Sequence, residues 1–161
     1  MNAHSAAFVT SMASTKSITN GSVVRAVSDK RETILRAATK VFAQRGYFNS
    51  KVADIAREAG IADGTVYLYF KSKDEVLHTI FDNAMAAFIA EGRAEIAKID
   101  GSAQKLRRIA QLHLEKLGAD REMAVVFQVE LRGSTKFMEE FSAAGFAEYL
   151  DIICQTIADG Q

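Results

Sequence analysis

The chain has 161 residues, and its 20 Lys/Arg and 20 Asp/Glu give a formal net charge of zero. It contains no proline and one cysteine, Cys154, which excludes an intrachain disulfide and favours a reducing compartment. The length and helix-favouring composition predict an all-α protein of one or two small domains. No apolar run reaches the ~20 residues that span a bilayer, and residues 1–28 lack a secretory signal. We therefore expect a cytoplasmic protein that has no membrane partner.

Charge is distributed unevenly along the chain. Residues 30–75 hold nine basic and six acidic side chains, whereas residues 76–161 hold nine basic and thirteen acidic ones. The positive excess favours contact of the first segment with phosphate groups. The asymmetry is modest and does not identify a function by itself.

Residues 1–28 show no sustained hydrophobic periodicity, and we expect a disordered tail there. Ser28 has a side chain suited to the N-cap of a first helix. Apolar residues then recur at helical spacing as far as Phe42, and Gly46 follows Arg45, where a glycine commonly ends a helix. The sequence therefore predicts a first helix from Ser28 to about Arg45.

Residues 52–77 carry the most informative pattern in the chain, VADIAREAGIADGTVYLYFKSKDEVL. Four apolar residues share one helical face: Val52, Ile55, Ala56 and Ala59. Gly60 follows at a position where helices commonly end, and apolar spacing resumes with Val66, Tyr67 and Phe70. Ser72 and Glu75 then have the spacing of a capping box that opens the next helix. Two short helices across such a turn predict a helix-turn-helix, whose second helix enters the major groove of DNA.

Further helical segments are expected at 73–98, 102–117, 120–131 and 137–157. The apolar stripe of 73–98 is longer than a DNA-binding unit needs, so this helix should continue into a second domain. We predict a helix-turn-helix DNA-binding domain at 29–75 and a helical ligand-binding and dimerisation domain at 76–161.

Three motifs follow one another between about Arg31 and Leu77: RETILRAATKVFAQRGY, S-x-V-x-x-IA-x-x-AG and GT-V-Y-x-YF-x-x-K-x-x-V. In these residues the chain resembles the TetR family of bacterial transcriptional regulators. The resemblance implies an all-α fold, a palindromic double-stranded DNA operator and a homodimer. Family members normally continue with two more helices beyond the end of this chain, so we interpret the second domain as C-terminally truncated. A natural short variant that dimerises through 120–131 and 137–157 is the alternative.

The resemblance also implies the DNA-contacting residues. Ser50 would cap the second helix and contact a phosphate, and Lys51 would add a charge contact. Thr65, Tyr69 and Lys73 match the other phosphate-contact positions, although a surface tyrosine and a solvated lysine are the alternatives. Base contacts are expected from the start of the recognition helix, at Ala62, Asp63, Gly64, Thr65, Tyr67 and Leu68.

Apolar and aromatic residues of the second domain are candidates to line a pocket for a small apolar effector, although any one of them is more simply core. The candidates are Phe81, Met85, Phe88, Phe127, Phe141 and Tyr149. The run QVELRGSTKFMEEF resembles the fatty-acid-degradation subgroup of TetR regulators, whose effector is long-chain acyl-CoA. By resemblance to that subgroup, Arg132 would bind the coenzyme A phosphates. The alternative is that Arg132 forms a surface ion pair with Glu130 or Glu139. His113 is either a hydrogen-bonded core histidine or a ligand contact.

The function that these patterns predict is a ligand-responsive repressor in fatty acid metabolism. The alternative is a truncated helical effector-binding or interaction protein with no effective operator binding. The sequence has no catalytic motif, no metal-ligand spacing and no cofactor motif, so we expect neither an enzyme nor a metal site.

Overall fold

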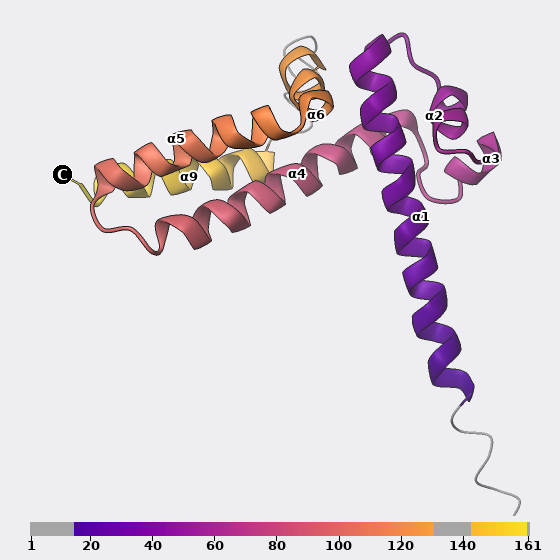
Figure 1. The fold of residues 1–161 in the computed structure, drawn as a ribbon, viewed down its shortest axis with the longest axis horizontal. Coiled ribbons are helices and arrows are strands. Elements are labelled where there is room, and N and C mark those ends of the chain that lie inside the picture. The colour runs from indigo at the N-terminus through magenta and orange to yellow at the C-terminus, as the bar shows by residue number, and fades with distance from the viewer. Residues whose placement is uncertain (1–14, 131–142, 161) are drawn as a thin grey trace, which may run out of the picture.

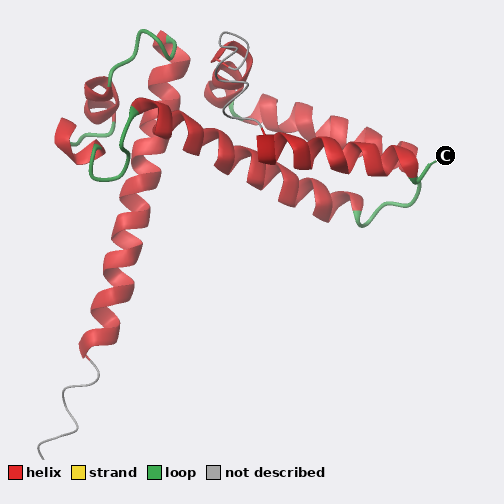
Figure 2. Ribbon diagram, turned by 180° about the vertical axis from the view of Figure 1, so that it is seen from behind, coloured by secondary structure: helices red, strands yellow, loops and turns green. Residues whose placement is uncertain are grey.

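A computed structural model of the chain describes residues 15–130 and 143–160. The described residues form helices and no strands, which confirms the all-α class (Figure 2). The elements are α1 (Thr15–Arg45), α2 (Val52–Glu58), α3 (Asp63–Val66), α4 (Lys73–Ile96), α5 (Ser102–Ala119), α6 (Arg121–Val125), the π-helical turn η1 (Val126–Glu130) and α9 (Ala143–Ala158). Within these residues no helix is both long and apolar enough to cross a membrane.

α4 joins the two parts of the molecule. Its beginning packs against α1, which also carries α2 and, through α2, α3 (Figure 1). The rest of α4 leads away from this unit, and α5 and α9 pack along it. The short α6 and η1 return from the end of α5 to contact α1. A shift of α4 at its far end therefore has a direct mechanical route to the helix-turn-helix.

The first helix begins earlier than the sequence pattern predicts. α1 starts at Thr15, so the expected N-cap at Ser28 is wrong, and so is the expected tail for residues 15–28. Residues 1–14 lie outside the described residues. Val27 and Ser28 are exposed, so the helix buries no face in the core at these two residues. Hydrophobic periodicity detects only helices that bury a face, and for this reason it missed the extension.

The main hydrophobic core lies between α1, α2, α3 and the first half of α4, and it also includes a residue of η1. Its members are Ile34, Leu35, Ala37, Ala38, Val41, Phe42, Tyr47, Ile55, Ala56, Val66, Phe70, Val76, Leu77, Ile80, Phe81 and Val126. The predicted domain division after residue 75 therefore runs through a shared core. The helix-turn-helix is stabilised by side chains that lie beyond that division.

Two glycines end helices as the sequence predicts. Gly46 and Gly60 have φ values of 77° and 66°, a left-handed conformation that a residue with a Cβ rarely adopts. These turns place α2 and α3 at an angle to their neighbours. Replacement of either glycine by a larger residue would strain the turn.

Helix N-termini are capped partly as predicted. The Ser72 hydroxyl accepts a hydrogen bond from the Glu75 N–H, and the Asp120 carboxylate accepts one from the Met123 N–H. α2 differs, because its N-cap residue is Lys51 and not Ser50. The buried Ser50 hydroxyl instead donates to the carbonyl of Gly46, 2.7 Å away. The turn between Gly46 and Ser50 brings this carbonyl close to the Ser50 hydroxyl, which gives it a hydrogen-bond donor.

Candidate DNA-binding surface and effector pocket

The start of α3 presents an open surface. Its predicted base-reading residues Ala62, Asp63 and Gly64 are exposed. Tyr67 and Leu68 are exposed as well, with relative solvent accessibilities of 57% and 81%. Ala62 is the N-cap residue of α3 and makes no side-chain cap, as its sequence predicts. These exposed residues form a surface that is open to a partner such as a groove of DNA.

Thr65 and Tyr69 lie at the edge of this surface. Thr65 is half-buried, and its neighbour Val66 enters the core. Tyr69 is also half-buried and packs against the core cluster, so it is not the fully solvent-facing tyrosine that the pattern suggests. Phosphate contacts from both residues stay predictions. Only the outer part of the Tyr69 ring is available for one.

The beginning of α2 carries a charged cluster that the sequence reading missed. One oxygen of Asp54, Oδ1, pairs with Arg45 at 2.9 Å and with Arg57 at 3.1 Å. Its second oxygen, Oδ2, accepts a hydrogen bond from the Lys51 backbone N–H at 3.0 Å. This hydrogen bond, followed by the nearby arginines, lowers the pKa of the Asp54 carboxyl below its ordinary value. Asp54 thus caps α2 in place of a hydroxyl residue and orders two arginines beside the predicted phosphate contact at Lys51.

The Asp54 arrangement predicts a pH-dependent stability. Because the pKa of Asp54 is lower in the folded state, its ionised carboxylate stabilises the fold above the ordinary Asp pKa range. This stabilisation is lost as the pH falls through the folded-state pKa. We expect Asp54→Asn to melt at a lower temperature than the unsubstituted chain at pH 7, because Asn keeps an acceptor for the Lys51 N–H but loses both ion pairs. The two melting temperatures should converge on acidification below the ordinary Asp pKa of about 3.9. Thermal unfolding at pH 7, 5 and 3 measures this, and a difference that does not change with pH would contradict it.

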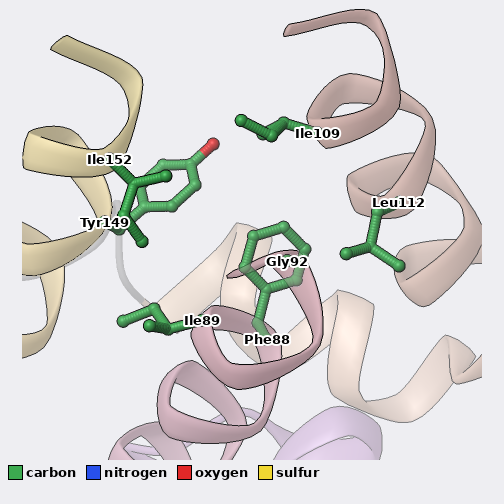
Figure 3. Close-up of a pocket in the computed structure, with 7 residues that line it drawn as sticks. All are labelled: Phe88, Ile89, Gly92, Ile109, Leu112, Tyr149 and Ile152. Atoms are coloured by element: carbon green, nitrogen blue, oxygen red, sulfur yellow. The ribbon is translucent and has the colours of Figure 1, made fainter. Parts of the chain in front are cut away.

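An apolar pocket lies between α4, α5 and α9, at the end of α4 remote from the helix-turn-helix (Figure 3). Its volume is about 250 Å³, including space at its open side, and its lining is apolar throughout. The lining residues are Phe88, Ile89, Gly92, Ile109, Leu112, Tyr149 and Ile152. The Tyr149 hydroxyl points across the pocket toward Ile109 (Figure 3). Burial raises the pKa of Tyr149. The pocket is suited to a hydrocarbon group.

The predicted effector residues divide into four groups. Phe88 and Tyr149 both line the pocket, with ring centroids 5.6 Å apart. Phe81 does not line it: it is buried in the core shared with α1, where its ring meets Phe127 at 4.4 Å. Phe81 and Phe127 therefore do not line the described pocket, because η1 folds back onto α1, and an effector contact from them stays a prediction. Arg132 and Phe141 lie outside the described residues.

Two further predicted residues lie near the pocket without lining it. His113 is exposed on α5, with its ring edge-on to Phe88 at 5.4 Å, so the expected core histidine is wrong. Met85 is half-buried, and its Cβ faces Gly145 of α9. Neither residue lines the described pocket.

Sequence reasoning missed five of the lining residues: Ile89, Gly92, Ile109, Leu112 and Ile152. Helical spacing could have found them, since Phe88 and Gly92 are four residues apart on α4, and Tyr149 and Ile152 are three apart on α9. Among the described residues no cluster of three or more His, Cys, Asp or Glu side chains could hold a metal ion. The two features with functional geometry are therefore the α2–α3 surface and the apolar pocket.

Comparison with protein families matches two models that together span most of the chain. Residues 34–80 match "Bacterial regulatory proteins, tetR family", and residues 81–161 match "YsiA-like protein, C-terminal region". The first match contains the α2–α3 surface, and the second contains the pocket.

Three relatives agree with these models. The fatty acid metabolism regulator protein of Bacillus subtilis is 35% identical over 127 residues, which cover 79% of this chain and 66% of that protein. The fatty acid degradation regulator FadR from Bacillus halodurans has a TM-score of 0.76 at 34% identity, covering 81% of this chain and 68% of that one. FadR from Bacillus subtilis in complex with stearoyl-CoA has a TM-score of 0.75 at 35% identity, covering 80% and 69%. The chain thus spans just under two thirds of the length of the curated relative.

The motifs at 31–77, the helix-turn-helix that they form and the two adjoining family matches all lead to the same result: the chain belongs to the TetR family of bacterial transcriptional regulators.

Proposed function

We propose that the protein is a ligand-responsive, sequence-specific DNA-binding regulator, a repressor that a long apolar effector such as long-chain acyl-CoA releases from its operator. The observation that carries this proposal is that α4 begins in the core of the helix-turn-helix and ends at the apolar pocket. A ligand that moves α4 can therefore change how α3 meets DNA. Family membership supports the regulatory role and a cytoplasmic place of action.

The proposed DNA contacts are of two kinds. Ala62, Asp63, Gly64, Tyr67 and Leu68 would meet base edges, since they are the exposed residues at the start of α3. Lys51 would meet a phosphate from the start of α2, and Arg45 and Arg57 add positive charge beside it. Phosphate contacts position the protein, and the base edges select the sequence.

A homodimer is proposed because one α3 reads only one half-site. Two copies would bind half-sites about 34–36 Å apart, the length of one DNA turn, so the operator would be palindromic. Three apolar side chains of α9 are exposed and available to a second copy: Phe146, Leu150 and Ile157. Their exposure supports an interface on this helix.

The proposed effector is apolar because the pocket lining is apolar. The described pocket is smaller than the roughly 300–1,000 Å³ of typical ligand sites, so a long acyl chain would have to widen it. Widening must separate α4, α5 and α9, and the movement of α4 supplies the coupling. The ligand must bind the DNA-incompetent arrangement more tightly, by about 1.4 kcal/mol for each tenfold loss of operator affinity. The likeness to FadR, solved with stearoyl-CoA, supports this class of ligand.

Selection of bound duplexes from a random pool, with and without stearoyl-CoA, tests the proposal. We expect enrichment of a palindrome with half-sites one turn apart, and lower recovery when stearoyl-CoA is added. Free coenzyme A is the control, because it carries the phosphates without the acyl chain. Failure to enrich any sequence at low or moderate salt would refute the DNA-binding role, and enrichment unaffected by stearoyl-CoA would refute the effector class.

Lys51→Ala should weaken binding to all duplexes by a similar factor and reduce the slope of log K against log salt by about 1, because one phosphate contact is lost. The matched control is Lys98→Ala, an exposed lysine just beyond the end of α4. It removes the same charge far from α2 and should leave the slope unchanged. Equal slopes for both variants would remove Lys51 from the interface.

A further inference from the structure

The first turn of α4 is tied to the segment between α1 and α2. The Lys73 ammonium donates hydrogen bonds to the backbone carbonyls of Tyr47 and Ser50, at 2.7 and 2.8 Å. It also lies over the Tyr47 ring, 4.1 Å from the centroid. Lysine has three N–H donors, so two of them are committed to carbonyls of one short turn. The side chain is half-buried and folds back onto the protein.

Tyr47 receives a second contact from α4. Its hydroxyl donates a hydrogen bond to the carboxylate of Asp74, the residue after Lys73. The ring is buried and meets Phe42 and Phe48 edge-on, each at a centroid distance of 5.4 Å. Tyr47 is thus held by α1 on one side and by the start of α4 on the other. We refer to Tyr47, Ser50, Lys73 and Asp74 as the Tyr47/Lys73 cluster.

We propose that Lys73 is a positioning residue and not the phosphate contact that the family resemblance implies. Together with Asp74, it holds the segment 47–50, and hence the start of α2, in a fixed position on α4. A phosphate contact that drew the ammonium away from the protein would break two hydrogen bonds to carbonyls and the contact with an aromatic face. The loss of such charge-assisted hydrogen bonds is costly when the carbonyls are left without a partner.

The cluster also gives α4 a specific connection to the DNA-binding surface, an extension that rests on the proposed function. α2 begins directly after the held segment and packs against α3. A displacement of α4 by a ligand at its far end would carry Lys73 and Asp74 with it, and the start of α2 would follow. Without the cluster, α4 could slide against the core while α2 and α3 kept their place, and the response to ligand would weaken.

Amide hydrogen exchange on the full chain, without DNA or ligand, tests the positioning role. We expect Lys73→Met to raise the exchange rates of amides 51–58 by about tenfold or more, the factor expected when a hydrogen bond to a charged group is lost. Amides of α5 should keep their rates, which shows that the effect is local. Tyr47→Phe, which removes only the hydroxyl bond to Asp74, should raise the same rates by a smaller factor. It also keeps the test decisive if Lys73→Met fails to fold.

Lys71→Met is the matched control, because Lys71 is exposed and lies two residues from Lys73 in the same charged segment. It should leave the exchange of 51–58 unchanged. Unchanged exchange at 51–58 in both Lys73→Met and Tyr47→Phe would overturn the positioning role. The readout needs no operator, so it decides the proposal even if the protein does not bind DNA.

Operator binding separates positioning from phosphate contact. If Lys73 positions α2, Lys73→Arg should restore the exchange rates, and Tyr47→Phe should reduce the stearoyl-CoA-dependent change in operator affinity severalfold although Tyr47 is buried away from DNA. A reduction of the salt slope by about 1 in Lys73→Met, with normal exchange at 51–58, would assign Lys73 to a phosphate instead. A full stearoyl-CoA response in Tyr47→Phe would overturn the coupling.

Discussion

Phe70→Ala is expected to lower the free energy of unfolding by about 3–5 kcal/mol, the range for truncation of a buried phenylalanine. Phe70 is 2% exposed in the core that α1, α2, α3 and α4 share, and the Arg31 guanidinium lies over its ring, 4.8 Å from the centroid. The substitution leaves a cavity where α3 joins α4, so operator binding should be lost together with stability. Urea unfolding followed by circular dichroism measures the first effect, and titration with the selected duplex measures the second.

Phe48→Ala is the control for this prediction, because it removes the same side chain from an exposed position in the same domain. Phe48 is 70% exposed, and its ring contact is to the edge of Tyr47. We expect its loss to cost less than about 1 kcal/mol. If Phe70→Ala cost no more than Phe48→Ala, the proposed core between α3 and α4 would be wrong.

Leu112→Ala is expected to cost about 2–5 kcal/mol and to enlarge the pocket. Leu112 is 1% exposed, lines the pocket and lies against Gly92 of α4, where a Cβ built on the glycine would be 3.9 Å from Leu112 Cδ2. Because the cavity left behind is apolar, a small hydrocarbon such as benzene should bind in it and restore part of the lost stability. Thermal unfolding of the variant, with and without saturating benzene, measures both effects.

Leu114→Ala provides the matched control on the same helix. Leu114 is 70% exposed and absent from the pocket lining, so its truncation should change stability by no more than about 0.5 kcal/mol and create no benzene site. A melting temperature of Leu112→Ala that benzene does not raise would show that α4, α5 and α9 collapse onto the vacated space. The pocket could then not be widened by substitution at this position.

The local features of the helix-turn-helix were predictable from the sequence because they depend on neighbours in the chain. Gly46 and Gly60 end their helices in the left-handed conformation, and Ser72 caps α4, all at the predicted positions. Each feature is a relation between residues at most a few positions apart. The same logic predicted that α3 would lack a side-chain cap at Ala62.

The candidate site was predictable only in part. The exposure of Leu68 follows from its place opposite Val66 and Phe70. The exposure of Tyr67 does not follow, because helical spacing groups Tyr67 with those apolar residues. The partners of Ser50 and Lys73 did not follow from spacing, because they are carbonyls of a turn that only the folded chain brings to them. A side chain that the pattern places at the surface can fold back when unpaired backbone groups lie within its reach.

The sequence by itself determined the helical class, the end of α2 before Gly60 and the apolar faces of the helices that pack into the core, since a period of 3.6 residues reports which side of a helix is buried. The tertiary structure alone decided what covers each face. It places Phe81 and Val126 in the core of the helix-turn-helix, and Phe88 and Tyr149 in the pocket, although all four are apolar residues on helical stripes. Periodicity gives a direction around each helix axis but carries no information about the position along it at which another helix crosses. That position follows from packing across the whole chain.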